Sequence, residues 1–67
     1  MITDEQLFAF TRFLGDVISK EFEKSDLTNQ TVSYFGVCPK EAKELVIRCE
    51  ELEYIKRTES GYMITTV

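Results

Sequence analysis

Four residues near the middle of the chain, Gly36-Val37-Cys38-Pro39, constrain the fold more than any others. Glycine readily takes the left-handed conformation that ends a helix. Proline is favoured at the first position of a new helix, where its missing N–H costs nothing. One helix is therefore expected to end at Gly36 and another to begin at Pro39, so the sequence predicts two helices joined by a tight turn.

The segment before the turn predicts a short helix over residues 29–35. Thr28 is a suitable N-cap for it, because its hydroxyl can accept a bond from a free backbone N–H of the first turn. Leu27 and Val32 then stand at the two positions of a hydrophobic staple, which fixes how the chain enters a helix. We expect Val32 and Phe35 to face the core.

The segment after the turn predicts a longer helix that runs from Pro39 to about Leu52. Helical spacing places Ala42, Val46 and Cys49 on one stripe, which indicates the buried side of that helix. The pattern then changes to two short runs rich in β-branched and aromatic residues, 54–57 and 62–65, separated by turn residues. That change predicts a β-hairpin with a positive φ at Gly61.

The N-terminal segment predicts the longest helix, residues 3–24. Thr3 and Gln6 have the spacing of a capping box. The apolar residues of this helix spread over roughly 220° of its circumference, and a small domain normally buries about half of that arc. Phe8 and Phe13 lie on opposite flanks of that arc. Either the helix is held deeply by its own domain, or one flank packs against a second copy of the chain, which the length of the helix favours.

Composition places the chain among ordinary globular proteins. Its 67 residues suffice for one domain, residues 1–67, with 43% hydrophobic and 30% charged residues. No apolar run approaches the roughly 20 residues that a membrane span needs. The first residues are acidic and lack the basic start of a signal peptide. We therefore expect a cytoplasmic protein with no membrane association.

The chemistry-bearing residues argue against an enzyme or a metal protein. The chain has no histidine, no phosphate-cradling glycine loop and only two cysteines, Cys38 and Cys49. On one helix these cysteines would lie roughly 16 Å apart, which is too far for a disulfide. Two thiolates without histidine cannot form a four-ligand zinc site. We expect two reduced cysteines, Cys49 in the core and Cys38 near a turn, with no cofactor, no metal and no catalytic residue.

The order of helix, helix, glycine turn, helix and hairpin resembles the winged helix-turn-helix family. The resemblance is carried by FGVCPKEAKELVIRCEELEYIKR and SGYMITT, within residues 27–67. It implies an α+β, mostly helical fold in which three helices precede a C-terminal β-hairpin, the wing. Two positions depart from the family pattern: Cys38 replaces the usual Ser or Thr cap, and Glu53 replaces a frequent Gly before the first wing strand.

The resemblance implies duplex DNA binding, with the third helix in the major groove and the wing on the backbone. The outward face of that helix should carry Lys40, Lys43, Glu44, Ile47 and Glu51, with Arg48 at its edge. The lysines would meet phosphate or guanine, Ile47 a thymine methyl and Glu44 a cytosine amine. In the wing, Lys56 and Arg57 would hold phosphates.

The charge distribution keeps a second interpretation open. The net charge is −4: residues 1–27 hold six acids and three bases (−3), and residues 28–67 hold six acids and five bases (−1). A bulk basic footprint for nucleic acid is therefore absent. Glu44 and Arg48 could simply form an i,i+4 pair on a solvated face.

Two functions are expected on these grounds. The first is a small DNA-binding transcriptional regulator that acts as a homodimer. The second is an acidic winged-helix module, an adaptor or inhibitor such as mobile elements encode, which binds a protein and no DNA. In either case Phe8 and Phe13 are the expected dimer or partner contacts.

Overall fold

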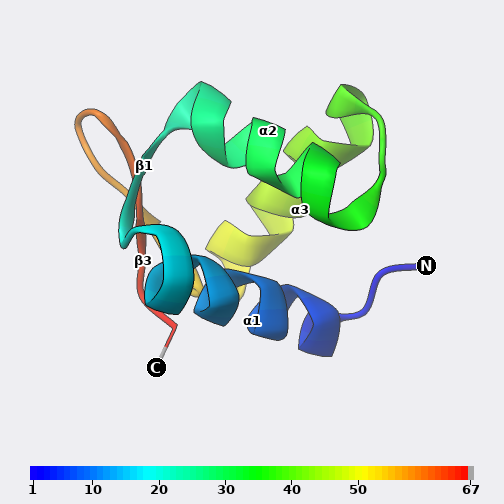
Figure 1. Ribbon diagram of the computed structural model, residues 1–67, viewed down its shortest axis with the longest axis horizontal. Coiled ribbons are helices and arrows are strands. Elements are labelled where there is room, and N and C mark those ends of the chain that lie inside the picture. The colour runs from blue at the N-terminus through cyan, green and yellow to red at the C-terminus, as the bar shows by residue number, and fades with distance from the viewer. Residues whose placement is uncertain (67) are drawn as a thin grey trace.

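The computed structural model describes residues 1–66 and contains three α-helices and a small sheet (Figure 1). The elements follow in the order α1 (Asp4–Phe13), the π-helical turn η1 (Leu14–Ile18), β1 (Glu21–Glu23), α2 (Lys24–Phe35), α3 (Pro39–Glu51), β2 (Ile55–Arg57) and β3 (Gly61–Ile64). The sheet is antiparallel with the strand order β1-β3-β2. This α+β, mostly helical arrangement confirms the predicted fold class and is compatible with a winged-helix-like fold.

The first helix begins as predicted and ends earlier. The capping box is present: the Thr3 N–H donates to Gln6 Oε1 at 2.7 Å, and the Gln6 N–H donates to Thr3 Oγ1 at 3.2 Å. The predicted helix over 3–24 is wrong beyond Ile18, because Ser19 is extended and residues 21–23 form β1. Strand pairing with β3 overrides the local helical pattern, and the Ile64 N–H donates to the Lys20 carbonyl at 2.7 Å.

The second helix starts five residues before the predicted start. It begins at Lys24 rather than residue 29, because β1 delivers the chain directly into it. Thr28 is therefore not a cap: its hydroxyl donates to the Lys24 carbonyl at 3.1 Å inside the helix. The predicted staple of Leu27 and Val32 is also wrong, since Leu27 lies in the first turn and is buried in the core. The predicted end is confirmed, with Gly36 left-handed at φ 67°.

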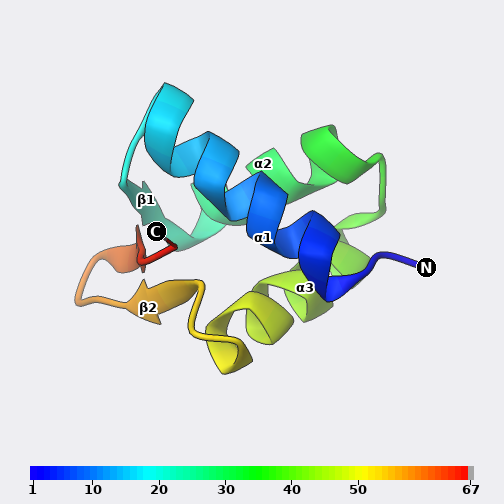
Figure 2. The same ribbon diagram turned by 90° about the horizontal axis from the view of Figure 1, so that it is seen from below.

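The third helix and the hairpin agree with the sequence. Pro39 opens α3 after Cys38, which is extended at the N-cap but makes no capping bond with its side chain. The hairpin pairs β2 with β3, with Ile55 opposite Ile64 and Arg57 opposite Tyr62. Figure 2 shows α1 crossing in front of the other elements, with α2 on one side of it and α3 on the other.

Gly61 lies in β3 opposite Glu23 of β1. Its φ of 158° is positive, as predicted. The stronger reason for glycine is space: a Cβ at this position would collide with the Phe22 carbonyl oxygen and would lie 2.8 Å from the Cα of Glu23. Those neighbours are backbone atoms of β1, which cannot rotate away as a side chain could. Only glycine allows β1 to pair at this point.

One core joins all three helices to the sheet. Its buried residues are Leu7, Phe10 and Leu14 from the first helical segment, Leu27 from α2, Val46 and Cys49 from α3, and Ile55, Tyr62 and Ile64 from the sheet. The buried hydroxyls of Thr11 and Thr31 donate to carbonyls one turn earlier, at 3.0 and 2.8 Å. Within residues 1–66, no helix is both long and apolar enough to cross a membrane.

The two cysteines lie as expected, Cys49 in the core and Cys38 exposed. Burial raises the pKa of the Cys49 thiol to about 12, and the charge of Asp4 adds to this effect. The Cys49 thiol therefore stays protonated at neutral pH, which makes it a poor nucleophile. It contributes apolar packing rather than chemistry.

Replacing Glu53 with glycine should stabilise the fold. Glu53 is left-handed at φ 63°, in the connection from α3 to β2. That conformation costs a non-glycine residue about 1–2 kcal/mol, while glycine loses about 0.5–1 kcal/mol more backbone entropy on folding. We expect Glu53→Gly to raise the free energy of unfolding by about 0.5–1 kcal/mol, or roughly 2–8 °C in Tm.

Thermal and urea denaturation would measure this change, and Glu59→Gly is the matched control. Glu59, in the hairpin loop, does not have a positive φ, so it gains no strain relief. The backbone bonds of Glu53, to Glu50 and from the Thr65 hydroxyl, survive the substitution. Equal effects of both substitutions would contradict the assignment of strain to Glu53.

Candidate nucleic-acid interface

The outward face of α3 is the one that the sequence predicted. Its buried stripe consists of Ala42, Val46 and Cys49. The opposite side exposes all six residues expected there, namely Lys40, Lys43, Glu44, Ile47, Arg48 and Glu51. The side chain of Ile47 is 53% exposed in the middle of this face, which is unusual for an isoleucine.

A cleft runs between α2, α3 and the hairpin. Its larger hollow, of about 620 Å³, is lined by Glu23, Lys24, Ser25, Thr28, Asn29, Pro39, Lys43 and Ser60. A smaller hollow, of about 180 Å³, is lined by Lys24, Thr28, Lys43, Val46, Ile47, Arg57 and Tyr62. The two share Lys24, Thr28 and Lys43, so they form one continuous feature, which we call the basic cleft. Figure 1 shows the hairpin loop and the start of α2 at the same end of the molecule.

Three cations from three different elements line the basic cleft. Lys43 comes from α3, Arg57 from β2 and Lys24 from the first turn of α2. Glu23 is the one acid that lines the larger hollow. Sequence reasoning did not single out Lys24, because it placed this residue at the end of the first helix. Lys24 reaches the cleft because β1 ends directly before it, and this strand was not predicted from the sequence.

The two predicted wing cations lie on opposite faces of the sheet. Side chains alternate along a strand, and cross-strand partners share a face. Arg57 is opposite the buried Tyr62 and so lies on the helix-facing side, beside the basic cleft. Lys56 is opposite the exposed Met63 and lies on the outer side. Lys43 and Arg57 therefore share one surface, whereas Lys56 does not.

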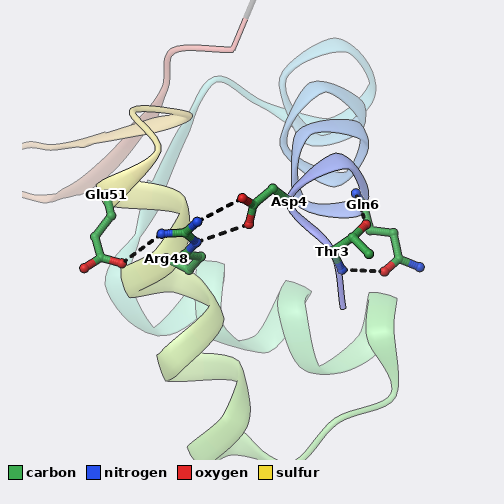
Figure 3. Close-up of polar contacts among 5 residues, drawn as sticks. All are labelled: Thr3, Asp4, Gln6, Arg48 and Glu51. Atoms are coloured by element: carbon green, nitrogen blue, oxygen red, sulfur yellow. Dashed lines mark hydrogen bonds and ion pairs between the residues drawn. The ribbon is translucent and has the colours of Figure 1, made fainter. Parts of the chain in front are cut away.

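Arg48 is held by carboxylates on both sides (Figure 3). Its guanidinium binds Asp4 through two hydrogen bonds, Nε to Oδ1 at 3.1 Å and Nη2 to Oδ2 at 2.9 Å. Glu51 lies 3.7 Å from Nη1. Within residues 1–66, Arg48 pairs with these two acids rather than with Glu44, so the expected i,i+4 pair is not formed. The bond from Arg48 lowers the pKa of Asp4 and raises the pKa of Arg48.

The other arginines are also paired. Arg57 donates to Glu50 at 3.1 Å, and this bond raises the pKa of Arg57. Arg12 lies 3.8 Å from Asp16, one turn further along. All three arginines thus face a carboxylate of their own chain, whereas none of the five lysines has such a partner within residues 1–66. Lysines are the cations left free to meet a ligand.

Phe8 and Phe13, the expected partner contacts, lie on different surfaces. Phe8 is 36% exposed and packs edge-to-face against Tyr54, with ring centroids 5.5 Å apart. Phe13 is 39% exposed, and its ring centroid lies 5.7 Å from that of Tyr34 on α2. Phe8 therefore belongs to the side of the hairpin connection, and Phe13 to the side of α2.

No family model, curated protein or solved structure matches this chain. Among residues 1–66, no three His, Cys, Asp or Glu side chains lie together as a metal site would require. Function is therefore inferred from the exposed side chains of α3 and from the basic cleft.

Removing the Asp4 carboxylate should weaken the fold in a pH-dependent way. The pKa of Asp4 is below its ordinary 3.8, so the ion pair with Arg48 stabilises the folded state above that value. This contribution is lost as the pH falls through the lowered folded pKa. We expect Asp4→Asn to unfold at lower urea than the wild type at pH 7, with a gap that closes below about pH 4.

Urea denaturation followed by circular dichroism across this pH range measures the gap. Glu5→Gln is the matched control, because Glu5 is also an acid in the first turn of α1 but has no arginine partner among the described residues 1–66. Both substitutions remove a favourable interaction with the helix dipole. A gap of the same size and pH dependence for Glu5→Gln would show that the dipole, not Arg48, is responsible.

Proposed function

We propose that this chain is a small winged-helix protein that binds duplex DNA as a transcriptional regulator. The observation that carries the proposal is the basic cleft beside an exposed α3: Lys24, Lys43 and Arg57 converge there from three elements. In this proposal α3 enters the major groove and the hairpin follows the adjacent backbone. The predicted winged-helix membership is part of the proposal.

The roles of the side chains follow from their positions. Lys24 and Lys43 bind phosphates of one strand, supported by the hydroxyl of Ser60, which also lines the cleft. Lys40, in the first turn of α3, adds a further phosphate contact. Ile47, beside Lys43 and exposed, contacts the methyl group of a thymine. Arg57 contributes once its bond to Glu50 loosens.

Such binding is weak and depends strongly on salt. About three lysines per chain contact phosphate, so log K should fall with log[salt] with a slope of about −3. Arg48 contributes little to DNA binding, because its guanidinium is already paired with Asp4 and Glu51. The acids on the same face, Glu44 and Glu51, add repulsion. DNA affinity should therefore be measured at low ionic strength.

Charge reversal in the basic cleft should strongly weaken this binding. We expect Lys43→Glu and Lys24→Glu each to reduce the affinity for a mixed-sequence duplex at least tenfold at low salt, since each replaces an attraction to phosphate with a repulsion. Fluorescence anisotropy measures the affinity, and circular dichroism checks the fold. Lys56→Glu makes the same charge change on the opposite face of the sheet and should have a much smaller effect.

The same experiment can overturn the proposal. A wild-type chain that binds no duplex at low salt excludes it. Equal losses for Lys43→Glu and Lys56→Glu would show that net charge, not the basic cleft, determines binding.

A second candidate function is a protein-interaction module that binds no DNA. It is favoured by Ile47, which is 53% exposed at the centre of the α3 face. The charges point the same way, because the net charge is −4 and all three arginines form ion pairs within the chain. In this alternative α3 is an adaptor or inhibitor surface, and Ile47 is its apolar anchor.

Substitutions at two positions of α3 separate the candidates. If α3 binds a protein, Ile47→Asp should lose the partner in a pull-down, while Lys43→Gln keeps it, because the anchor is apolar. If α3 binds DNA, Lys43→Gln should weaken duplex binding several-fold. Ile47→Ala should weaken duplex binding only by the loss of the contact with a thymine methyl group. A chain that captures no partner and binds duplex in the predicted order would rule out the second candidate.

A further inference from the structure

The outer face of the first helical segment carries a stripe that the domain leaves uncovered. Ala9, Phe13 and Val17 are spaced four residues apart, and residues at this spacing follow one another on one face of a helix. Phe13 is 39% and Val17 66% exposed. Tyr34, which packs against Phe13 and is 48% exposed, widens the apolar surface on the side of α2. In Figure 2 no other element lies in front of α1.

A row of charge borders this stripe. Arg12 and Asp16 lie one turn apart, directly beside Phe13 and Val17 in the sequence, and their side chains are 57% and 67% exposed. The distance from Arg12 Nε to Asp16 Oδ2 is 3.8 Å, at the long end for an ion pair, so both groups can engage further partners. The row thus presents one cation and one anion at a spacing of about 6 Å along the helix.

We propose that this face binds a second copy of the same chain in an antiparallel, two-fold symmetric dimer. A two-fold axis perpendicular to the helix reverses the second helix, so Arg12 of each copy meets Asp16 of the other. A two-fold axis parallel to the helix would instead place the two charge rows on opposite sides of the apolar stripe, where they do not meet. The charge row is therefore complementary to itself in the antiparallel orientation only, as an isologous interface requires.

The apolar stripe fits the same arrangement. With the axis near Phe13, the small Ala9 of one copy lies against Val17 of the other, and the two Phe13 rings lie near the axis. A standard interface buries about 800 Å² per partner, which is about one sixth of the 4577 Å² surface of this chain. Phe8 takes no part, because it packs against Tyr54 on the other side of the helix. This dimer does not depend on the proposed DNA binding, since α3 and the basic cleft lie elsewhere.

A charge-swap experiment tests the dimer. Arg12→Asp leaves only acids in the row, and Asp16→Arg leaves only bases, so each variant alone should repel its own copy. An equimolar mixture of the two should dimerise, because acids then face bases on both sides of the axis. The double variant Arg12→Asp/Asp16→Arg should also form homodimers. Sedimentation equilibrium from micromolar to millimolar chain measures the mass against the 7.8 kDa of one chain.

The wild type should approach twice the chain mass within this range, and Val17→Asp should stay at the mass of one chain. Met63→Asp places an acid on the outer face of the sheet and should leave the dimer intact. Circular dichroism confirms that each variant is folded. A wild type that stays monomeric throughout, or a mixture of folded charge-swap variants that does so, would overturn the proposal. Either result would leave duplex binding by α3 unaffected.

Discussion

The close approach of two backbones at Gly61 is the constraint on which the candidate interface depends. Because position 61 has no Cβ, β1 can lie against β3, with Phe22 opposite Tyr62. The pairing of β1 fixes the start of α2 at Lys24, which brings that ammonium to the basic cleft. On its other side β3 holds β2, which carries Arg57. Two of the three cations of the cleft are thus placed through one strand.

Local signals in the sequence correctly predicted the helix ends that carry a characteristic capping or terminating residue. Gly36, Pro39 and the capping box of Thr3 and Gln6 set their helix ends correctly. The strand β1 was missed because residues 21–23 alternate acids with one phenylalanine, which fits a helix equally well. Their pairing partners lie about 40 residues further along, so nothing local distinguishes the two structures. The late start predicted for α2 was a consequence of the same error.

The candidate site was predictable where one helix determines it. Counting 100° per residue from the buried stripe correctly predicted six exposed residues of α3, Ile47 included, although Glu41 is exposed as well. The partners of each charged side chain were harder to predict, because they lie on segments that are distant in the sequence. Arg48 binds Asp4, 44 residues away in the sequence, rather than its helical neighbour Glu44. Lys56 and Arg57 are adjacent in sequence yet lie on opposite faces of the sheet.

The pairing of the arginines decides what kind of recognition remains possible. Guanidinium groups bind guanine through two parallel bonds, and that geometry is what makes arginine the commonest base reader. In this chain two guanidinium N–H groups of Arg48 already donate to Asp4, and Arg57 donates to Glu50. Within residues 1–66 the cationic side chains without a carboxylate partner are lysines, which act as point charges and suit phosphates better than bases. Sequence preference on duplex DNA would then rest on Ile47 and on the shape of α3, so a preference for thymine-containing steps should accompany weak, salt-dependent affinity.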